Sequence, residues 1–361
     1  MQIGIVGLPY SGKSTLFQTI TKTHIDTSAL GKNETHQAVI KVPDNKLDKL
    51  IEIFSPKKTN SAIIDLVDVI GLKKGDSGST QFTSNFLSTV KTNDALVQVV
   101  RLFANDAVPH PDGSVDMIRD IASFETEFIL SDLSILENRI ERIKKTYQKS
   151  GGDLLLRELP TLEKSYEILH TEKPLREAEL NDNELFILKT YSLLTLKPML
   201  IVLNLDEGQR NDAEKYLEST RKLKAGKNTK VMSLFGKIEL EMSELSDDDA
   251  ALFMSEYGIK ESALHMLIRE AYDLLGLQSF YTVGEDECRA WTIKKGMTAQ
   301  EAAGAIHSDF VNKFIRAEVV GYDDFIKNGG SFAKSKEQGV WRLEGKEYIV
   351  TEGDIISIRH S

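Results

Sequence analysis

The chain has 361 residues, of which 41% are apolar and 28% charged, and its formal net charge is −10. This length exceeds one ordinary domain, so we expect two or three. The acidic balance argues against strong non-specific binding to nucleic acid, but not against docking on a ribonucleoprotein through a local basic patch. No stretch approaches the roughly 20 apolar residues of a membrane span, and we expect no signal peptide before the first strand pattern. The single cysteine, Cys288, excludes an internal disulfide, so we expect a cytoplasmic protein with no membrane partner.

The first predicted elements frame a phosphate-binding loop. Residues 3–6 are typical of a short buried strand, and a helix is predicted from Leu16. The sequence between them matches G-x-x-x-x-G-K-[ST], in which backbone N–H groups and the positive end of the following helix bind phosphate oxygens. We expect Lys13 to act as a catalytic residue at the β- and γ-phosphates, and Ser14 to ligate Mg²⁺. The expected nucleotide-binding residues of this loop are Gly7, Leu8, Pro9, Tyr10, Ser11, Gly12, Lys13, Ser14 and Thr15.

Further apolar runs predict more strands of the same sheet. They lie at residues 62–67, 95–100, 199–203 and 230–234 and are separated by helical patterns, which favours a parallel sheet covered on both faces. The first run leads into Asp68-Val69-Ile70-Gly71, a D-x-x-G pattern. We expect Asp68 to hold Mg²⁺ through a water molecule. We expect the Gly71 N–H to contact the γ-phosphate and to move when that phosphate leaves.

A different pattern separates the strands at 95–100 and 199–203. Apolar residues recur at alternating spacings of three and four, which is a heptad seam. Ser150-Gly151-Gly152 interrupts the seam. The pattern predicts an antiparallel helical hairpin inserted into the sheet domain; a role as a docking arm stays open beside plain core packing. The seam residues are Ile129, Leu133, Leu136, Ile140, Ile143 and Tyr147, and then Leu155, Leu159, Leu162, Tyr166 and Leu169.

The base-recognition loops are expected after the strands at 199–203 and 230–234. Guanine-specific switch proteins usually carry N-K-x-D after the first of these, whereas this chain has Asn204-Leu205-Asp206-Glu207. We expect Asn204 to bind the N7 edge of the base and Leu205 to cover its face. The longer carboxylate of Glu207 fits guanine poorly, which favours ATP or relaxed specificity, although a plain loop is the alternative. Ser233, Leu234 and Phe235 are expected to bind the base through backbone N–H groups.

The C-terminal sequence predicts a small half-barrel of the ubiquitin-like kind. Strand patterns occur at 288–293, 314–320, 339–343, 348–350 and 354–358. A helix is predicted over 298–306, because Thr298 and Glu301 have the spacing of a capping box.

Taken together, these motifs resemble the Obg-like ATPases of the YchF type. The resemblance rests on the phosphate loop and on residues 68–72, 204–207, 289–293 and 307–310. Residues 115–121, 314–318 and 343–346 extend it, so it covers essentially the whole chain.

The resemblance implies an α/β fold. A Ras-like P-loop domain at 1–120 and 197–277 would contain a coiled-coil insertion at 121–196 and be followed by a TGS domain of β-grasp fold at 278–361. It also implies Mg²⁺-dependent hydrolysis of ATP in preference to GTP, and association with ribosomes in translation or stress control. We expect a monomer whose TGS domain binds RNA or protein.

The chain departs from related switch proteins at several positions. Leu72 stands where related GTPases place a glutamine that orients the attacking water. His110 matches a family histidine proposed for that role, which makes it a catalytic candidate; a solvated loop imidazole is the alternative. Tyr10-Ser11 replaces the usual Asn-Val, so potassium dependence stays open. Lys32 falls where the family has its Mg²⁺-sensing threonine, and Thr35 is a possible substitute.

Three functions remain in competition. The first is a slow ATPase whose bound nucleotide controls a docking surface. The second is a nucleotide-binding adaptor that does not hydrolyse, and the third is a GTP-specific switch.

Overall fold

The structure is a computed structural model that describes residues 1–22, 36–69, 82–150, 157–224, 226–257 and 259–361. The chain forms two compact units. The first consists of Met1–Ala38 and Asp65–Leu267, and the second of Val39–Ile64 and Ile268–Ser361. The three-part division expected from the sequence stays a prediction.

The first unit is built on a six-stranded sheet with the order β2-β4-β1-β5-β6-β7. The pairs β4–β1, β1–β5, β5–β6 and β6–β7 are all parallel, as the apolar runs predicted. Polar side chains that follow β1, β4, β5 and β6 therefore gather at one edge of the sheet, where ligands of such folds bind. The strands are β1 (Gln2–Val6), β2 (His36–Lys41), β4 (Ile63–Asp68), β5 (Ala95–Arg101), β6 (Met199–Asn204) and β7 (Thr229–Leu234).

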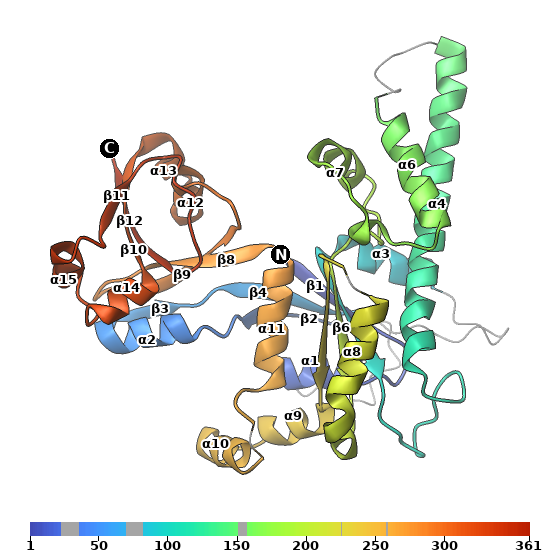
Figure 1. The fold of residues 1–361 in the computed structure, drawn as a ribbon, viewed down its shortest axis with the longest axis horizontal. Helices are drawn as coiled ribbons and strands as arrows, with labels where there is room; N and C mark the ends of the chain where they lie inside the picture. The colour runs from blue at the N-terminus through green and yellow to red at the C-terminus, as the bar shows by residue number, and fades with distance from the viewer. Residues whose placement is uncertain (23–35, 70–81, 151–156, 225, 258) are drawn as a thin grey trace. The chain divides into compact units, whose positions relative to one another are not determined.

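Helices cover this sheet (Figure 1). On one face, Phe86 of α3 and Phe124 and Phe128 of α4 pack with Val100 of β5 and Leu203 of β6 in one buried cluster. No helix among the described residues is long and apolar enough to cross a bilayer. The helices are α1 (Lys13–Thr21), α3 (Ser84–Thr92), α4 (Met117–Ser150), α6 (Leu159–His170), α7 (Asp182–Lys189), α8 (Ala213–Leu223), α9 (Gly236–Ser243), α10 (Asp247–Glu256) and α11 (Ala263–Leu274), with short 3₁₀ turns at Leu175–Glu177 and Glu207–Asp212.

The helical insertion forms its own apolar cluster. Leu136 and Ile143 of α4 pack with Leu162 and Leu169 of α6, as the heptad spacing predicted. The expected turn at Gly151-Gly152, and Leu155 of the second seam, lie outside the described residues. Buried polar contacts fasten α4 to the sheet domain: Arg176 pairs with Glu125 of α4 and also donates to Thr229 of β7.

The second unit has a mixed sheet with the order β11-β10-β12-β8-β9-β3. β8 and β9 are antiparallel, as are β10 and β12, while β12 and β8 are parallel, which gives the β-grasp pattern. Helix α12 packs on one face, and the predicted capping box of Thr298 and Glu301 is present. The elements are α2 (Asn45–Phe54), β3 (Lys58–Asn60), β8 (Leu277–Thr282), β9 (Glu287–Lys294), α12 (Ala299–Ile306), α13 (Ser308–Lys313), β10 (Phe314–Gly321), α14 (Tyr322–Lys327), α15 (Phe332–Glu337), β11 (Arg342–Glu344) and β12 (Asp354–His360).

Two strands predicted for this unit are shorter in the structure than the sequence indicated. Only residues 342–344 of the stretch around 339–343 form a strand, because the N–H groups of Val340 and Trp341 donate to the Ser335 carbonyl at the end of α15. In the stretch 348–350, only Ile349 forms a bridge, to Thr298. The Tyr348 N–H is used in a turn with Gly345.

Residues 39–64 belong to the second unit, which the sequence did not indicate. β3 pairs in parallel with β9, so this early segment adds the edge strand of the C-terminal sheet. Asp44 caps α2 by accepting the N–H groups of Lys46 and Leu47, and it also accepts the hydroxyl of Tyr281 from β8. One carboxylate thus fixes both the start of α2 and its place against the sheet.

Candidate nucleotide-binding site

The phosphate loop runs from the end of β1 into α1. Gly12 precedes α1 with φ 96°, a left-handed conformation that favours glycine. A Cβ at Gly12 would lie 2.3 Å from the Asn204 amide nitrogen, so the loop and β6 approach too closely for any side chain. α1 has no side-chain cap, which leaves its first N–H groups for an anion. Tyr10 also has a left-handed backbone, with φ 63°, and its side chain is 62% exposed.

Three polar side chains meet at the N-terminal end of α1. Lys13 is buried, and its Nζ donates to the Leu8 carbonyl at 2.8 Å. The Ser14 hydroxyl donates to Asp68, at the end of β4, with an Oγ–Oδ2 distance of 3.2 Å. Burial raises the pKa of Asp68, an effect that Lys13 and Ser14 oppose.

The oxygens of Ser14 and Asp68 fit a magnesium ion. Mg²⁺ prefers oxygen ligands in octahedral geometry, in which neighbouring ligands at about 2.1 Å from the ion lie about 3 Å apart. The 3.2 Å between the Ser14 hydroxyl and the Asp68 carboxylate is also an ordinary hydrogen-bond distance, so it fits Ser14 as a direct ligand and Asp68 as the holder of a neighbouring water ligand, as expected from the sequence. A divalent cation at this position would also keep the buried carboxylate ionised.

Burial lowers the pKa of Lys13 to about 8, although the charge of Asp68 works in the opposite direction. Because a bound phosphate stabilises the charged ammonium, binding must raise this pKa and take up a proton when the pH is above 8. Affinity for ATP is therefore expected to be constant between about pH 7 and 8 and to fall as the pH rises further, by up to about tenfold per unit. The pKa of the terminal phosphate is about 6, so the charge of the phosphate is nearly constant above pH 8.

Titration calorimetry of ATP binding between pH 7 and 9.5 tests this expectation. Two buffers of different ionisation enthalpy report the proton uptake. A Kd that does not change between pH 8 and 9.5 would show that the charge of Lys13 plays no part in binding.

Asn204, at the end of β6, ties two loops together. Its Nδ2 donates to the Ser11 carbonyl at 3.0 Å, and its Oδ1 accepts the N–H of Gly236 at 3.1 Å. Both ends of the amide are thus engaged with the phosphate loop and with the start of α9. Its expected contact with the base stays a prediction, because that contact needs at least one of these bonds to be shared.

A pocket of about 430 Å³ opens beside the phosphate loop. Of the predicted nucleotide-binding residues, five line it: Gly12, Thr15, Asn204, Leu205 and Leu234. The others do not: Gly7, Leu8, Pro9, Tyr10, Ser11, Lys13, Ser14, Glu207, Ser233 and Phe235. Glu207 is exposed at the start of the 3₁₀ turn that Asp206 caps. Gly236 and Lys237, from the loop expected after the strand at 230–234, line the pocket as well. It is also lined by residues that were not predicted from the sequence: Phe103, Ala104, Asn105, Leu240 and Leu264. The first three directly follow β5 near the ligand edge of the sheet, and this position was a usable signal.

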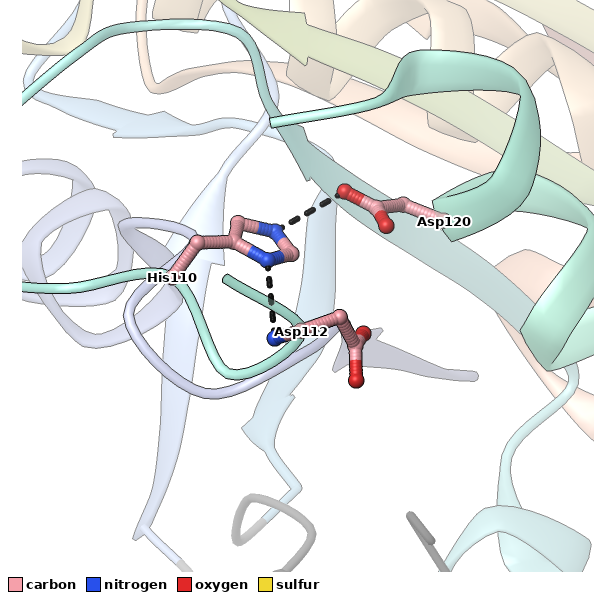
Figure 2. A group of neighbouring side chains, drawn as sticks. All are labelled: His110, Asp112 and Asp120. Carbon is pink, nitrogen blue, oxygen red and sulfur yellow. Dashed lines mark hydrogen bonds and ion pairs between the residues drawn. The ribbon is translucent and has the colours of Figure 1, made fainter. Parts of the chain in front are cut away.

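His110 lies in a buried polar cluster (Figure 2). Its Nε2 is 2.9 Å from the carboxylate of Asp120, and its Nδ1 accepts the N–H of Asp112 at 3.1 Å. An N–H can only be accepted by an unprotonated Nδ1, so the ring proton lies on Nε2 and is donated to Asp120. Arg119 donates to the other oxygen of Asp120 at 2.8 Å. The alternative of a solvated loop imidazole does not describe this residue.

The Ser11 side chain is 1% exposed, and its hydroxyl oxygen has no hydrogen-bond partner among the residues that the structure describes. Leaving such a group unpaired in the interior costs about 1–3 kcal/mol. We therefore expect Ser11→Ala to raise the free energy of unfolding by about 1 kcal/mol, measured by urea denaturation. ATP affinity serves as the control and is expected to change less than twofold, because the backbone of Ser11 is retained. A loss of stability would contradict this assignment of the hydroxyl.

Several expected site residues lie outside the described part of the chain. They are Gly71, Leu72, Lys32 and Thr35. Their roles stay predictions.

Known proteins are similar to this chain over its whole length. Residues 2–139 match a family model described as "50S ribosome-binding GTPase", and residues 277–361 match the YchF-GTPase_C model, described as a protein of unknown function (DUF933). The protein named "Ribosome-binding ATPase YchF" from Bacillus subtilis (strain 168) is 41% identical over 99% of this chain and 98% of its own. The protein of the same name from Escherichia coli O157:H7 is 39% identical over 98% and 97%.

A solved structure agrees with these sequence comparisons. The YchF GTPase of Schizosaccharomyces pombe superposes with a TM-score of 0.86 at 30% identity, covering 99% of this chain and 97% of that one. The chain has a P-loop that leads into α1, a β-grasp sheet at the C-terminus and full-length similarity to YchF proteins at about 40% identity. It therefore belongs to the YchF family.

Proposed function

We propose that the protein is a magnesium-dependent P-loop switch that binds ATP and hydrolyses it slowly to ADP and phosphate. The observation that carries this proposal is the convergence of Lys13, Ser14 and Asp68 at the uncapped N-terminal end of α1. Family membership supports it, because the relatives from Bacillus subtilis and Escherichia coli carry the name ATPase.

Each of these residues has a separate task in the proposal. Lys13 neutralises charge on the β- and γ-phosphates, while the N–H groups at the start of α1 hold the phosphate oxygens. Ser14 and Asp68 would hold Mg²⁺, which supplies further charge neutralisation when it is bound. Single-turnover hydrolysis of ATP with and without Mg²⁺ tests this assignment. Hydrolysis that does not depend on Mg²⁺ would contradict it.

We further propose a preference for ATP over GTP. Leu205 is buried in the pocket wall, and the exposed Glu207 does not line the pocket, so the carboxylate that usually selects guanine is displaced. Competition between ATP and GTP for the same site measures the preference. A Kd for GTP that is tenfold lower, about 1.4 kcal/mol, would favour a GTP-specific switch instead.

The proposed partner is the ribosome or one of its subunits, in the cytoplasm. The relatives' names mention ribosome binding, and the model matched by residues 2–139 has a 50S ribosome-binding description. We propose that the protein acts as a monomer and that its β-grasp unit supplies an RNA or protein contact. Co-sedimentation with purified ribosomes in ATP and in ADP tests the partner. Equal absence from the ribosome pellet in both nucleotides would argue against it.

A non-hydrolysing adaptor is the second candidate, and one observation favours it. Both ring nitrogens of His110 are engaged, with Asp120 and with Asp112, so this imidazole holds no free nitrogen for a water molecule. Tight ATP binding without phosphate release in a single turnover would establish the adaptor.

A further inference from the structure

The loop that follows β5 is tethered by one buried guanidinium. Arg101, the last residue of β5, is only 3% exposed. Its Nε donates to the Phe103 carbonyl at 3.1 Å, and its Nη2 donates to the carbonyls of Asn105 at 3.4 Å and Val108 at 2.8 Å. Its guanidinium carbon also lies 4.7 Å from the centre of the Phe103 ring. The loop is therefore wrapped around the end of the Arg101 side chain.

Arg101 supplies the polar attachment of residues 103–109 to the described part of the chain. Across the parts of the chain that the structure describes, every hydrogen bond between residues 103–109 and the rest of the protein comes from Arg101. The remaining bonds are internal: the Val108 N–H donates to the Asn105 carbonyl, and the Ala107 N–H donates to the Asn105 side chain. Loss of the guanidinium would remove all the hydrogen bonds that join this loop to other described residues.

Arg101 makes no ion pair with any described carboxylate, which is unusual for a buried cation. Burial lowers its pKa, yet an arginine stays charged at neutral pH. One of its nitrogens, Nη1, is buried without any acceptor among the described residues. A buried charge that is satisfied only by carbonyls of one loop serves the conformation of that loop, because an apolar residue would fill the same space at lower cost.

That loop is one wall of the pocket beside the phosphate loop. Phe103, Ala104 and Asn105 line the pocket of about 430 Å³, whereas Arg101 does not. Thr15 of α1 lines the same pocket. The end of the pocket at the phosphate loop and the wall that contains Phe103 therefore belong to one cavity. An arrangement of this kind places the triphosphate at α1 and leaves the nucleoside beside Phe103 and Asn105.

We propose that Arg101 is a positioning residue that holds the Phe103–Asn105 wall against the nucleoside part of the bound nucleotide, without touching the ligand itself. The proposal rests on the proposed nucleotide-binding function of this site. It predicts that Arg101 governs affinity for the nucleoside and leaves affinity for the phosphates unchanged. If Arg101 merely stabilised the fold, or supplied positive charge to the phosphates, its replacement would not weaken nucleoside binding while leaving phosphate binding unchanged.

Binding of ATP and of inorganic tripolyphosphate, measured by calorimetry with Mg²⁺, separates these roles. For Arg101→Lys, which keeps the charge but loses the planar fork, we expect about tenfold weaker binding of ATP. Binding of tripolyphosphate is expected to stay within twofold of the wild type. The matched control is Arg176→Lys, because Arg176 is equally buried at 2% exposure but pairs with Glu125 and Thr229. It is expected to change neither affinity.

Unchanged ATP affinity in Arg101→Lys, or equal weakening of both ligands, would overturn the proposal. Should this variant not fold, Phe103→Ala tests the premise that the wall contacts the nucleoside, since Phe103 is half-buried and its ring is part of the wall. A Phe103→Ala protein that binds ATP like the wild type would also overturn it. Failure of the proposed function is distinguishable, because it would appear in the wild type as an absence of ATP binding.

Discussion

Replacement of Lys13 by alanine is expected to lower the single-turnover rate of ATP hydrolysis at least ~100-fold, the scale typical of losing one charge-stabilising donor. Lys13 is buried at the start of α1, and its ammonium lies where the phosphate oxygens are expected to bind. No other described lysine has its Nζ hydrogen-bonded to the phosphate loop. Because the ammonium also binds the ground state, the affinity for ATP is expected to fall as well. Rapid-quench measurement of phosphate release in a single turnover gives the rate directly.

Lys22→Ala is the matched control for this measurement. Lys22 follows the same helix at its C-terminal end and is exposed, so its removal changes the net charge equally without changing the site. We expect its hydrolysis rate to stay within twofold of the wild type. A Lys13→Ala protein that released phosphate at the wild-type rate would rule out hydrolysis at this loop.

The sequence was sufficient to predict the phosphate loop, because there the local signals agree. An apolar run, two glycines at fixed spacing and a helix pattern each demand the same backbone path, and the close approach of Gly12 to Asn204 shows why no other residue fits. The parallel strands were equally predictable, since continuous apolar runs bounded by helices have few other solutions. The capping box at Thr298 was predictable for the same local reason.

Contacts between elements that are far apart in the sequence were not predictable in this way. The apolar positions of α2 indicate a helix, but nothing in them specifies that it covers the C-terminal sheet through Asp44 and Tyr281, residues far apart in the sequence. β3 has three residues, all polar, and gives no strand signal. His110 was named as a candidate from the sequence, but its burial was not predictable, and Arg101 was not named at all, because the sequence shows neither the burial of a polar side chain nor its partners.

Replacement of His110 by alanine is expected to lower the single-turnover hydrolysis rate by about 100-fold or more, the usual contribution of a positioned acid–base group. Asp120 accepts the Nε2 proton and so leaves Nδ1 as the nitrogen that can accept a proton from water. For Nδ1 to do so, it must release the Asp112 N–H. ATP affinity is expected to stay within threefold, because His110 does not line the pocket beside the phosphate loop. The same single-turnover assay, with a thermal scan as the control for folding, measures the effect.

Asp120 extends this prediction, since it fixes which nitrogen of His110 carries the proton. If the two side chains act as one unit, Asp120→Ala loses nearly as much rate as His110→Ala, and the double variant loses no more than His110→Ala alone. Additive losses would mean that Asp120 acts on something other than the imidazole. Wild-type hydrolysis in His110→Ala, together with a lower melting temperature, would assign the pair a structural role. It would then join the loop after β5 to the first turn of α4, and the attacking water would have to be oriented by a different residue.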